Sequence, residues 1–124
     1  MQEQITALDL NDLIVNEKVA IIDVRSIDEY NYYHINKAYN IHISELSINK
    51  VIEVLQNNND DSKIIITYCN AGGRGGRAFS LLKEQNQQPN YHKYGLFIKN
   101  LQHGINQWID SGFPIIKFTN NIKL

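Results

Sequence analysis

Two adjoining runs of the sequence decide the fold: Lys63-Ile64-Ile65-Ile66-Thr67-Tyr68 and Cys69-Asn70-Ala71-Gly72-Gly73-Arg74-Gly75-Gly76-Arg77. The first is β-branched and apolar almost throughout, which is typical of a strand covered on both faces in a parallel sheet. The second is rich in glycine and leads into residues with helical spacing, Ala78, Leu81 and Leu82. Ligand sites of open α/β sheets lie at the carboxyl ends of strands, so the junction at Cys69 is expected to be such a place.

The rest of the chain alternates between strand-like and helix-like segments. A short apolar run at 19–24 predicts a second buried strand, and we expect a third near 91–94 and a weaker one near 38–41. Ser26 and Glu29 have the spacing of a helix capping box. Apolar residues at helical spacing form three further sets: Leu8, Leu10, Leu13 and Ile14; Ile48, Val51, Ile52 and Leu55; Leu101, Ile105, Trp108 and Ile109. This alternation predicts an α/β domain with a mainly parallel sheet.

Composition excludes several classes of protein. Twelve basic residues against thirteen acidic ones give a net charge of −1, so charge offers no reason to expect nucleic acid or an anionic membrane as partner. A single cysteine excludes an intramolecular disulfide. No signal peptide or membrane-length apolar run is visible, and a cytoplasmic protein is the default expectation. We expect residues 1–124 to form one domain, with 118–124 as a loose tail.

The loop after the central strand has the chemistry of an anion cradle. Gly72, Gly73, Gly75 and Gly76 allow a tight curl with several N–H groups pointing inward, and the following helix adds its positive end. Helix N-termini and basic neighbours such as Arg74 favour the thiolate form of a cysteine, which is the nucleophilic form. A buried structural cysteine and a phosphate-binding loop are the alternatives, although no Gly-Lys-Ser/Thr follows as in a P-loop.

With these motifs, nearly the whole chain resembles the rhodanese family. The resemblance lies in three pieces in order: Ile22-Asp23-Val24-Arg25 with Glu29-Tyr30, His34-Ile35, Ala38 and Asn40-Ile41; Tyr68-Cys69 through Arg74; and Leu101, Gly104-Ile105, Trp108 and Gly112-Phe113-Pro114. Three family glycines are replaced, by Tyr33, Lys37 and His103, and the common Ser-Gly-Asn of the active-site loop is Ala71-Gly72-Gly73. These changes affect turns and the donor preference of the loop.

The resemblance implies a three-layer rhodanese-like fold with a five-stranded parallel sheet flanked by helices. It also implies a ping-pong sulfurtransferase without metal or organic cofactor, in which Cys69 takes sulfane sulfur from a donor such as thiosulfate as a persulfide. Cyanide, a small thiol or an acceptor protein would then take the sulfur. The donor would bind to the loop residues Asn70, Ala71, Gly72, Gly73, Arg74 and Gly75.

Loop length separates this function from its nearest rival. Cys69 and Arg74 have the spacing Cys-x4-Arg, whereas the resemblance implies Cys-x5-Arg for phosphatases and arsenate reductases of the same fold, whose larger loop fits a tetrahedral oxyanion. A phosphatase or arsenate reductase relative is therefore the weaker alternative. A non-catalytic rhodanese-like module that binds a partner is another, against which the retained Cys69 and Arg74 argue.

Three further residues have both a structural and a functional interpretation. Asp23 and Arg25 end a strand, where a structural ion pair is favoured over a place in the pocket. Arg77 falls in the first helical turns, where it could contact substrate or simply be solvated. The four histidines, His34, His42, His92 and His103, lack the spacing of a metal site.

Overall fold

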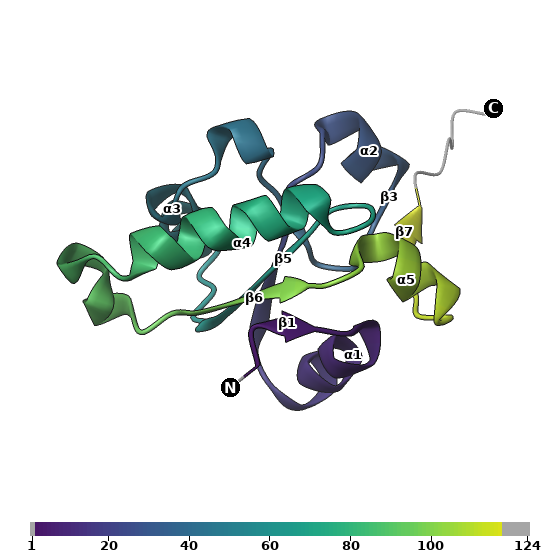
Figure 1. Ribbon diagram of the computed structural model, residues 1–124, viewed down its shortest axis with the longest axis horizontal. Helices are drawn as coiled ribbons and strands as arrows, with labels where there is room; N and C mark the ends of the chain where they lie inside the picture. The colour runs from purple at the N-terminus through teal and green to yellow at the C-terminus, as the bar shows by residue number, and fades with distance from the viewer. Residues whose placement is uncertain (1, 118–124) are drawn as a thin grey trace.

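The computed structural model describes residues 2–117, so the tail expected at 118–124 lies outside the described residues. Its centre is a parallel sheet with the strand order β1-β6-β5-β2-β4 (Figure 1). The five strands are β1 (Gln4–Ile5), β2 (Val19–Asp23), β4 (Tyr39–Asn40), β5 (Ile64–Tyr68) and β6 (Phe97–Leu101). A separate antiparallel pair joins β3 (Tyr33–His34) to β7 (Ile116–Lys117). The predicted five-stranded parallel sheet is confirmed, with β5 in the middle.

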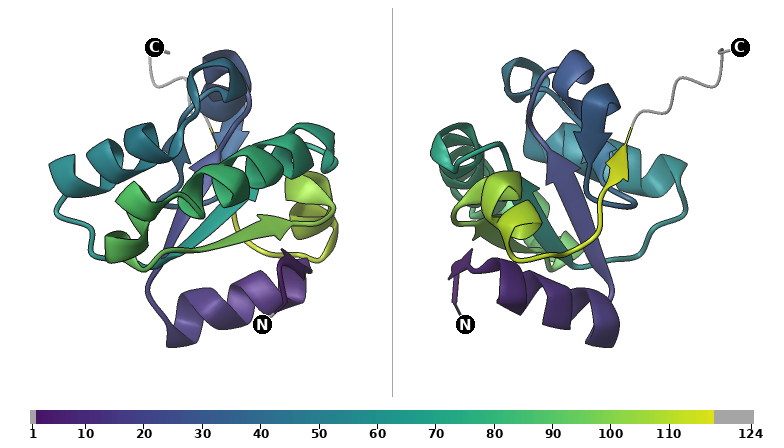
Figure 2. Two further views of the ribbon diagram at one scale, coloured as in Figure 1. Left: turned by 60° about the vertical axis from the view of Figure 1, so that its left-hand side comes forward. Right: turned by 90° about the vertical axis from the view of Figure 1, so that its right-hand side faces the viewer.

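Helices cover both faces of this sheet (Figure 2). One layer contains α1 (Ala7–Asn16) and α5 (Gly104–Asp110), and the other contains α3 (Ile48–Asn57) and α4 (Gly73–Asn86). The shorter elements α2 (Ile27–Tyr32), η1 (Ile43–Glu45) and η2 (Pro89–Tyr94) connect them. The predicted α/β architecture in three layers is therefore the one that the chain adopts.

Side-chain alternation along the central strands explains why both layers are needed. Ile22 and Ile65 face the cluster formed with α3 and α4, whereas Ile21 and Ile66 face the cluster formed with α1 and α5. Successive strand residues point to opposite faces, so a run without polar residues must be covered on both sides. The continuous hydrophobicity of β2 and β5 thus fixes their central place in the sheet.

One strand was predicted at the wrong place. Residues 91–94 belong to the 3-10 helix η2, which starts at Pro89 and ends at Gly95 in the left-handed conformation. The strand is β6, whose buried Lys99 and Asn100 are polar and hid its apolar pattern. Leu101, expected on a helix, ends this strand instead.

The helix predictions differ in how well they located the buried face. The four apolar residues predicted for α3 are its four buried residues, which confirms that face. In α1, however, Leu8 is 62% exposed and Ile14 is 39% exposed, while Ala7 and Leu10 are buried. The predicted face of α1 was therefore wrong in part, because four apolar residues crowd more than one side of a ten-residue helix.

The three residues that replace family glycines differ in their backbone conformation. Tyr33 (φ −163°) and His103 (φ −110°) adopt conformations open to any residue. Lys37 has φ +68° in a turn closed by a 3.0 Å hydrogen bond from the N–H of Ala38 to the carbonyl of Ile35. Only Lys37 is therefore strained by lacking a glycine.

We predict that Lys37→Gly raises the free energy of unfolding by about 0.5–1 kcal/mol. Relief of the left-handed strain outweighs the extra entropy that glycine gives to the unfolded chain. Lys37→Ala is the matched control, because it removes the same charge and keeps the strain. Urea unfolding of the three proteins checks this, and equal stability of the Gly and Ala variants would contradict it.

Candidate active site

Cys69 lies at the carboxyl end of the central strand β5, in the short loop that leads to α4. It is only 2% exposed, and it packs with apolar residues on the α3 and α4 side of the sheet. Its Sγ accepts a hydrogen bond of 3.1 Å from the N–H of Gly72. The candidate nucleophile thus lies at the start of α4, with a backbone donor on its sulfur.

The first turn of α4 provides further donors. The N–H groups of Gly73, Arg74 and Gly75 have no hydrogen-bond acceptor within residues 2–117, as expected for the first residues of a helix whose N-cap has no side chain. These N–H groups form the N-terminal end of a 14-residue helix, where the helix dipole places its partial positive charge. The loop can therefore hold a second anionic atom next to Sγ.

Only one of the four glycines after Cys69 turns the backbone of the loop, although all four were expected to do so. Gly72 alone has a positive φ, of +120°, and a Cβ there would lie 2.3 Å from the carbonyl oxygen of Gln102. Gly73, Gly75 and Gly76 are ordinary helical residues of α4. The expectation that all four glycines curl the loop was wrong in this respect, since the helix begins already at Gly73.

Gly75 allows α4 to approach the end of β5. A Cβ at this buried position would lie 3.2 Å from the nitrogen of Cys69 and 3.3 Å from the Cα of Tyr68. At Gly76, by contrast, no atom of residues 2–117 beyond its chain neighbours and the backbone of α4 lies within 4 Å of such a Cβ. The absence of a side chain at Gly75 therefore sets how close the helix lies to the nucleophile.

The N-terminus of α5 holds the other side of the loop. The N–H groups of Ile105 and Asn106 donate to the carbonyls of Cys69 (2.9 Å) and Asn70 (3.0 Å). Gly104 permits this approach: it has φ +65°, and a Cβ would lie 2.5 Å and 2.3 Å from the same two oxygens. Because peptide units are planar and trans, the N–H groups that follow these carbonyls point away from α5.

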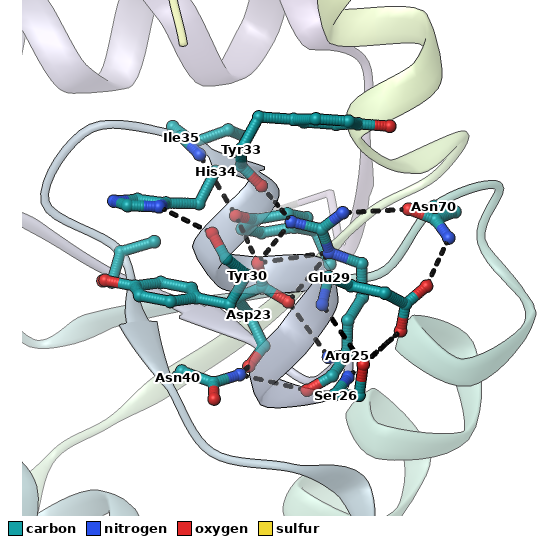
Figure 3. A network of polar contacts seen from close by, with 12 residues as sticks. Asp23, Arg25, Ser26, Glu29, Tyr30, Tyr33, His34, Ile35, Asn40 and Asn70 are labelled. Carbon is teal, nitrogen blue, oxygen red and sulfur yellow. Dashed lines mark hydrogen bonds and ion pairs between the residues drawn. The ribbon is translucent and has the colours of Figure 1, made fainter. Parts of the chain in front are cut away.

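Arg74 is engaged with α2. Its Nη1 and Nη2 donate to the two carboxylate oxygens of Glu29 at 2.7 Å and 3.0 Å, and both side chains are about 30% exposed, at 29% and 31%. Asn70 donates to the same carboxylate at 2.7 Å (Figure 3). The hydrogen bond from Arg74 lowers the pKa of Glu29 far below its usual range, against the opposing effect of burial, and raises the pKa of Arg74. Arg74 thus closes the loop onto α2.

Asp23 and Arg25 form a buried pair behind the loop. Arg25 contacts Asp23 at 2.8 Å and donates to the side chain of Asn70 at 3.0 Å and to the carbonyl of Tyr33 (Figure 3). Burial opposes the charge on Arg25, but the hydrogen bond and charge of Asp23 prevail and raise its pKa. Tyr68 adds a hydrogen bond of 2.7 Å to Asp23. The pair is a structural network that reaches the loop through Asn70.

Arg77 is exposed one turn further along α4. Its Nη1 lies 3.9 Å from the position that a Cβ of Gly73 would occupy, so the guanidinium lies over the start of the helix. Its side chain makes no hydrogen bond or ion pair with the residues at 2–117. Ala71 and Gly73 are the other exposed residues of the loop.

Two residues of this arrangement were not predicted as part of the site. Glu29 was predicted as a helix cap, which it is, since it accepts from the N–H of Ser26 at 3.0 Å, and it was otherwise noted only in a family pattern. Gly104 was noted only in a family pattern. For Glu29, the sequence signal was a carboxylate in an earlier helix that could pair with one of the two arginines of the loop. The contact of Gly104 depends on tertiary packing and has no such signal in the sequence.

Other places in the described part of the chain do not compete as catalytic centres. A cavity of about 570 Å³ lies at the amino ends of β2 and β4, lined among others by Val19, Tyr39 and Asp60. It is at the opposite end of the sheet from Cys69. Within residues 2–117, no three His, Cys, Asp or Glu side chains gather as for a metal ion, and no helix is long and apolar enough to cross a membrane.

The chain belongs to the rhodanese-like domain family, which matches residues 6–111. A curated relative, the uncharacterized protein slr1261 of Synechocystis, is 25% identical over 111 residues, which are 90% of this chain and 54% of that protein. The chain thus spans about half the length of that relative. A rhodanese-related protein from Thermoplasma volcanium is similar in structure, with 26% identity, a TM-score of 0.66 and coverage of 92% of this chain and 97% of that one.

Solved structures with different activities share this fold. A thiosulfate sulfurtransferase from Pseudomonas aeruginosa gives a TM-score of 0.67 at 18% identity, over 95% of this chain and 21% of that one. An As-Sb reductase from Leishmania major gives 0.68 at 16% identity, over 90% and 79%. Similarity at this level shows the fold, so the activity must be argued from the loop itself.

The two glycines at the start of α4 provide a matched pair of substitutions. We predict that Gly75→Ala lowers the free energy of unfolding by about 1–3 kcal/mol, because its Cβ meets the backbone of β5. Gly76→Ala should raise it by about 0.5–1 kcal/mol, because alanine favours a helix and the space is open. Urea unfolding of both variants measures this. Equal effects at the two positions would contradict the close approach of α4.

The Glu29 contacts predict a pH-dependent contribution to stability. Glu29→Gln should lower the free energy of unfolding at pH 7 by about 1–2 kcal/mol, since it loses charged hydrogen bonds to Arg74 and Asn70. The folded pKa is depressed, so this contribution is complete above the unfolded pKa of about 4.3 and is lost as the pH falls through the folded pKa. The difference in free energy of unfolding between the wild type and Glu29→Gln should therefore be smaller at pH 3 than at pH 7.

Glu53→Gln is the control for this measurement. Glu53 pairs with Lys50 on the surface of α3, with side chains 60% and 44% exposed. Such exposed pairs contribute about 0.5 kcal/mol or less. If Glu29→Gln lowers the free energy of unfolding at pH 7 by no more than Glu53→Gln does, the contact with Arg74 does not stabilise the loop.

Proposed function

We propose that this protein is a sulfurtransferase that carries sulfur on Cys69 as a persulfide. The observation that supports this is the hydrogen bond from the N–H of Gly72 to Sγ at the start of α4, a helix whose next three N–H groups have no acceptor among residues 2–117. These donors suit a thiolate, and they suit equally the terminal sulfur anion of a persulfide. Both states of the proposed cycle are therefore stabilised by the same backbone groups.

The reaction has two steps, each a displacement at sulfur. The Cys69 thiolate attacks the outer sulfur of thiosulfate, the bond to the sulfonate sulfur breaks, and sulfite leaves with the electron pair. The resulting persulfide anion then gives its outer sulfur to cyanide or to a thiolate, and the Cys69 thiolate returns. Donor and acceptor balance both steps, so the proposed reaction needs no metal or organic cofactor.

The dimensions of the loop favour sulfur over a tetrahedral oxyanion. Only four residues separate Cys69 from Arg74, one fewer than in the Cys-x5-Arg loops that the family resemblance implies for phosphatases and arsenate reductases. Cys69 is also almost fully buried, so a substrate must present the reacting atom at its tip. A terminal sulfane sulfur meets this requirement with a single atom.

The cysteine content bears on the acceptor. These 124 residues contain one cysteine, so they supply no second thiol to accept the sulfur, and we propose a small thiol or a partner protein as acceptor, with cyanide as the simplest acceptor in an assay. We place the activity in the cytoplasm, where reducing conditions keep such thiols free.

Intact-mass measurement tests the central step. After incubation with thiosulfate, we predict that the protein gains the mass of one sulfur atom, and that cyanide removes this mass with release of thiocyanate. Cys69→Ser should gain nothing, because a hydroxyl at this place cannot hold a sulfane sulfur. Circular dichroism of the variant provides the control for folding.

Other outcomes would favour the alternatives. If neither thiosulfate nor other sulfane donors load Cys69, the proposal fails and a partner-binding rhodanese-like module becomes the better interpretation. Turnover of p-nitrophenyl phosphate or arsenate that depends on Cys69 would instead indicate the phosphatase or arsenate reductase class.

A further inference from the structure

A pair of polar side chains lies on the apolar face of the sheet that is covered by α4. Thr67 of β5 and Asn100 of β6 are register partners, and they are only 0% and 2% exposed. Their strand neighbours on this face, Ile65, Cys69 and Ile98, belong to the apolar cluster under α3 and α4. Two polar side chains buried side by side cost free energy unless both are hydrogen-bonded. The hydrogen bonds of this pair therefore show how the core accommodates it.

Both side chains bind one carbonyl near the start of α4. The hydroxyl of Thr67 lies 3.2 Å from the carbonyl oxygen of Gly75, the nearer of two carbonyls to which it can donate, the other being that of Lys99 at 3.4 Å. One end of the Asn100 amide lies 3.1 Å from the Gly75 oxygen and 3.0 Å from the carbonyl oxygen of Thr67. Carbonyls only accept, so this end is the NH₂ group. The other end lies 2.9 Å from the side-chain amide of Gln4.

Gly75 allows the helix to rest directly on this pair. A Cβ at Gly75 would lie 2.8 Å from the side-chain amide of Asn100, so a larger residue would push α4 away from β6. The next N–H along the helix, that of Gly76, donates to the carbonyl of Gly72 at 2.8 Å. This bond joins residues 72–76 into one helical turn. Holding the Gly75 carbonyl therefore also holds the N–H of Gly72, which binds Sγ of Cys69.

The strand that carries the sulfur also carries the hydroxyl that holds the helix. Thr67 and Cys69 are two residues apart in the chain, and alternation along β5 directs their side chains to the same face of the sheet. The contact between Thr67 and Gly75 thus connects the N–H groups of α4 to the frame that positions Sγ. Backbone donors stabilise a reacting charge most when they are already in place before the reaction.

We propose that Thr67 and Asn100 are positioning residues for sulfur transfer, which hold the first turn of α4 at the distance from Sγ of Cys69 that the charged sulfur requires. This inference rests on the proposed sulfurtransferase function and adds to its site two residues that touch neither the sulfur nor the donor. The N–H groups of α4 act on the reacting sulfur. Loss of the pair should therefore slow the reaction of bound donor and leave the binding of the donor nearly unchanged.

Thr67→Val tests the hydroxyl, because valine keeps the branched shape of the side chain and removes its donor. The rate of Cys69 persulfide formation is measured by intact mass over a range of thiosulfate concentrations. We expect Thr67→Val to lower the rate constant at saturating thiosulfate about tenfold, with the half-saturating concentration within about twofold of the wild type. Thr67→Ser keeps the hydroxyl and should stay within about twofold of the wild type in both quantities.

Two further variants accompany this measurement. Asn100→Leu removes the other donor to Gly75 and should lower the saturating rate in the same way. Ile65→Val is the matched control, because Ile65 is buried on the same face of β5 and its truncation loosens the core without touching a carbonyl of α4. It should leave the saturating rate unchanged. All rates are measured at a temperature at which circular dichroism shows every variant to be folded.

Amide hydrogen exchange tests the position of the helix without any sulfur donor. The N–H groups of Gly72 and Gly76 are hydrogen-bonded within the turn that the pair holds. We expect Thr67→Val to speed their exchange about threefold or more relative to that of Leu82, a buried residue further along α4. Ile65→Val should leave this ratio as in the wild type.

The outcomes separate this inference from the proposed function. If the wild type forms no persulfide, the sulfurtransferase proposal fails, and an unchanged exchange ratio in Thr67→Val would overturn the positioning role by itself. If the persulfide forms and Thr67→Val reacts at saturation as fast as Ile65→Val, or Thr67→Ser is as slow as Thr67→Val, the assignment of the pair is wrong while the function stands.

Discussion

The hydrogen bonds from the N-terminus of α5 to the carbonyls of Cys69 and Asn70 hold the loop on which the site depends. They require Gly104 in a positive-φ conformation, since a Cβ would lie within 2.5 Å of both oxygens. With these carbonyls fixed, the backbone turns at Gly72 and α4 begins at once. The α5 contact thus fixes the two peptide units that join Cys69 to the turn at Gly72, while α4 itself orients the N–H groups that follow.

A second set of contacts ties the same loop to the other half of the sheet. Glu29 binds Arg74 and Asn70 from α2, and Asn70 in turn accepts from Arg25, which is paired with the buried Asp23. Three separate segments of the chain thus meet at Asn70. Glu29, Arg74 and Asn70 thus hold one another at the edge of the loop, whereas the side chain of Arg77 has no acceptor within residues 2–117.

The division between backbone and side chains suits the chemistry of sulfur. A persulfide needs stabilisation of one diffuse negative charge, which N–H groups and a helix end provide without a proton transfer. The charged side chains near the loop can then be used for structure or for selecting the donor. A shared fold can accordingly be found in proteins with different reactions, as in the sulfurtransferase and the As-Sb reductase that are similar to this chain in structure.

Several features could be predicted from the amino-acid sequence: the parallel sheet, the central place of β5, the buried face of α3 and the position of Cys69 at a strand end. These follow from local patterns: apolar runs, helical spacing and glycines directly after a strand. It misplaced β6, because Lys99 and Asn100 are polar residues buried by their neighbours, and it missed part of the exposed side of α1. Two features became visible in the folded chain alone: Gly104 allows α5 to bind the loop, and Arg74 is paired while Arg77 has no acceptor within residues 2–117. Both depend on which distant segments come into contact, and local spacing contains no information about that.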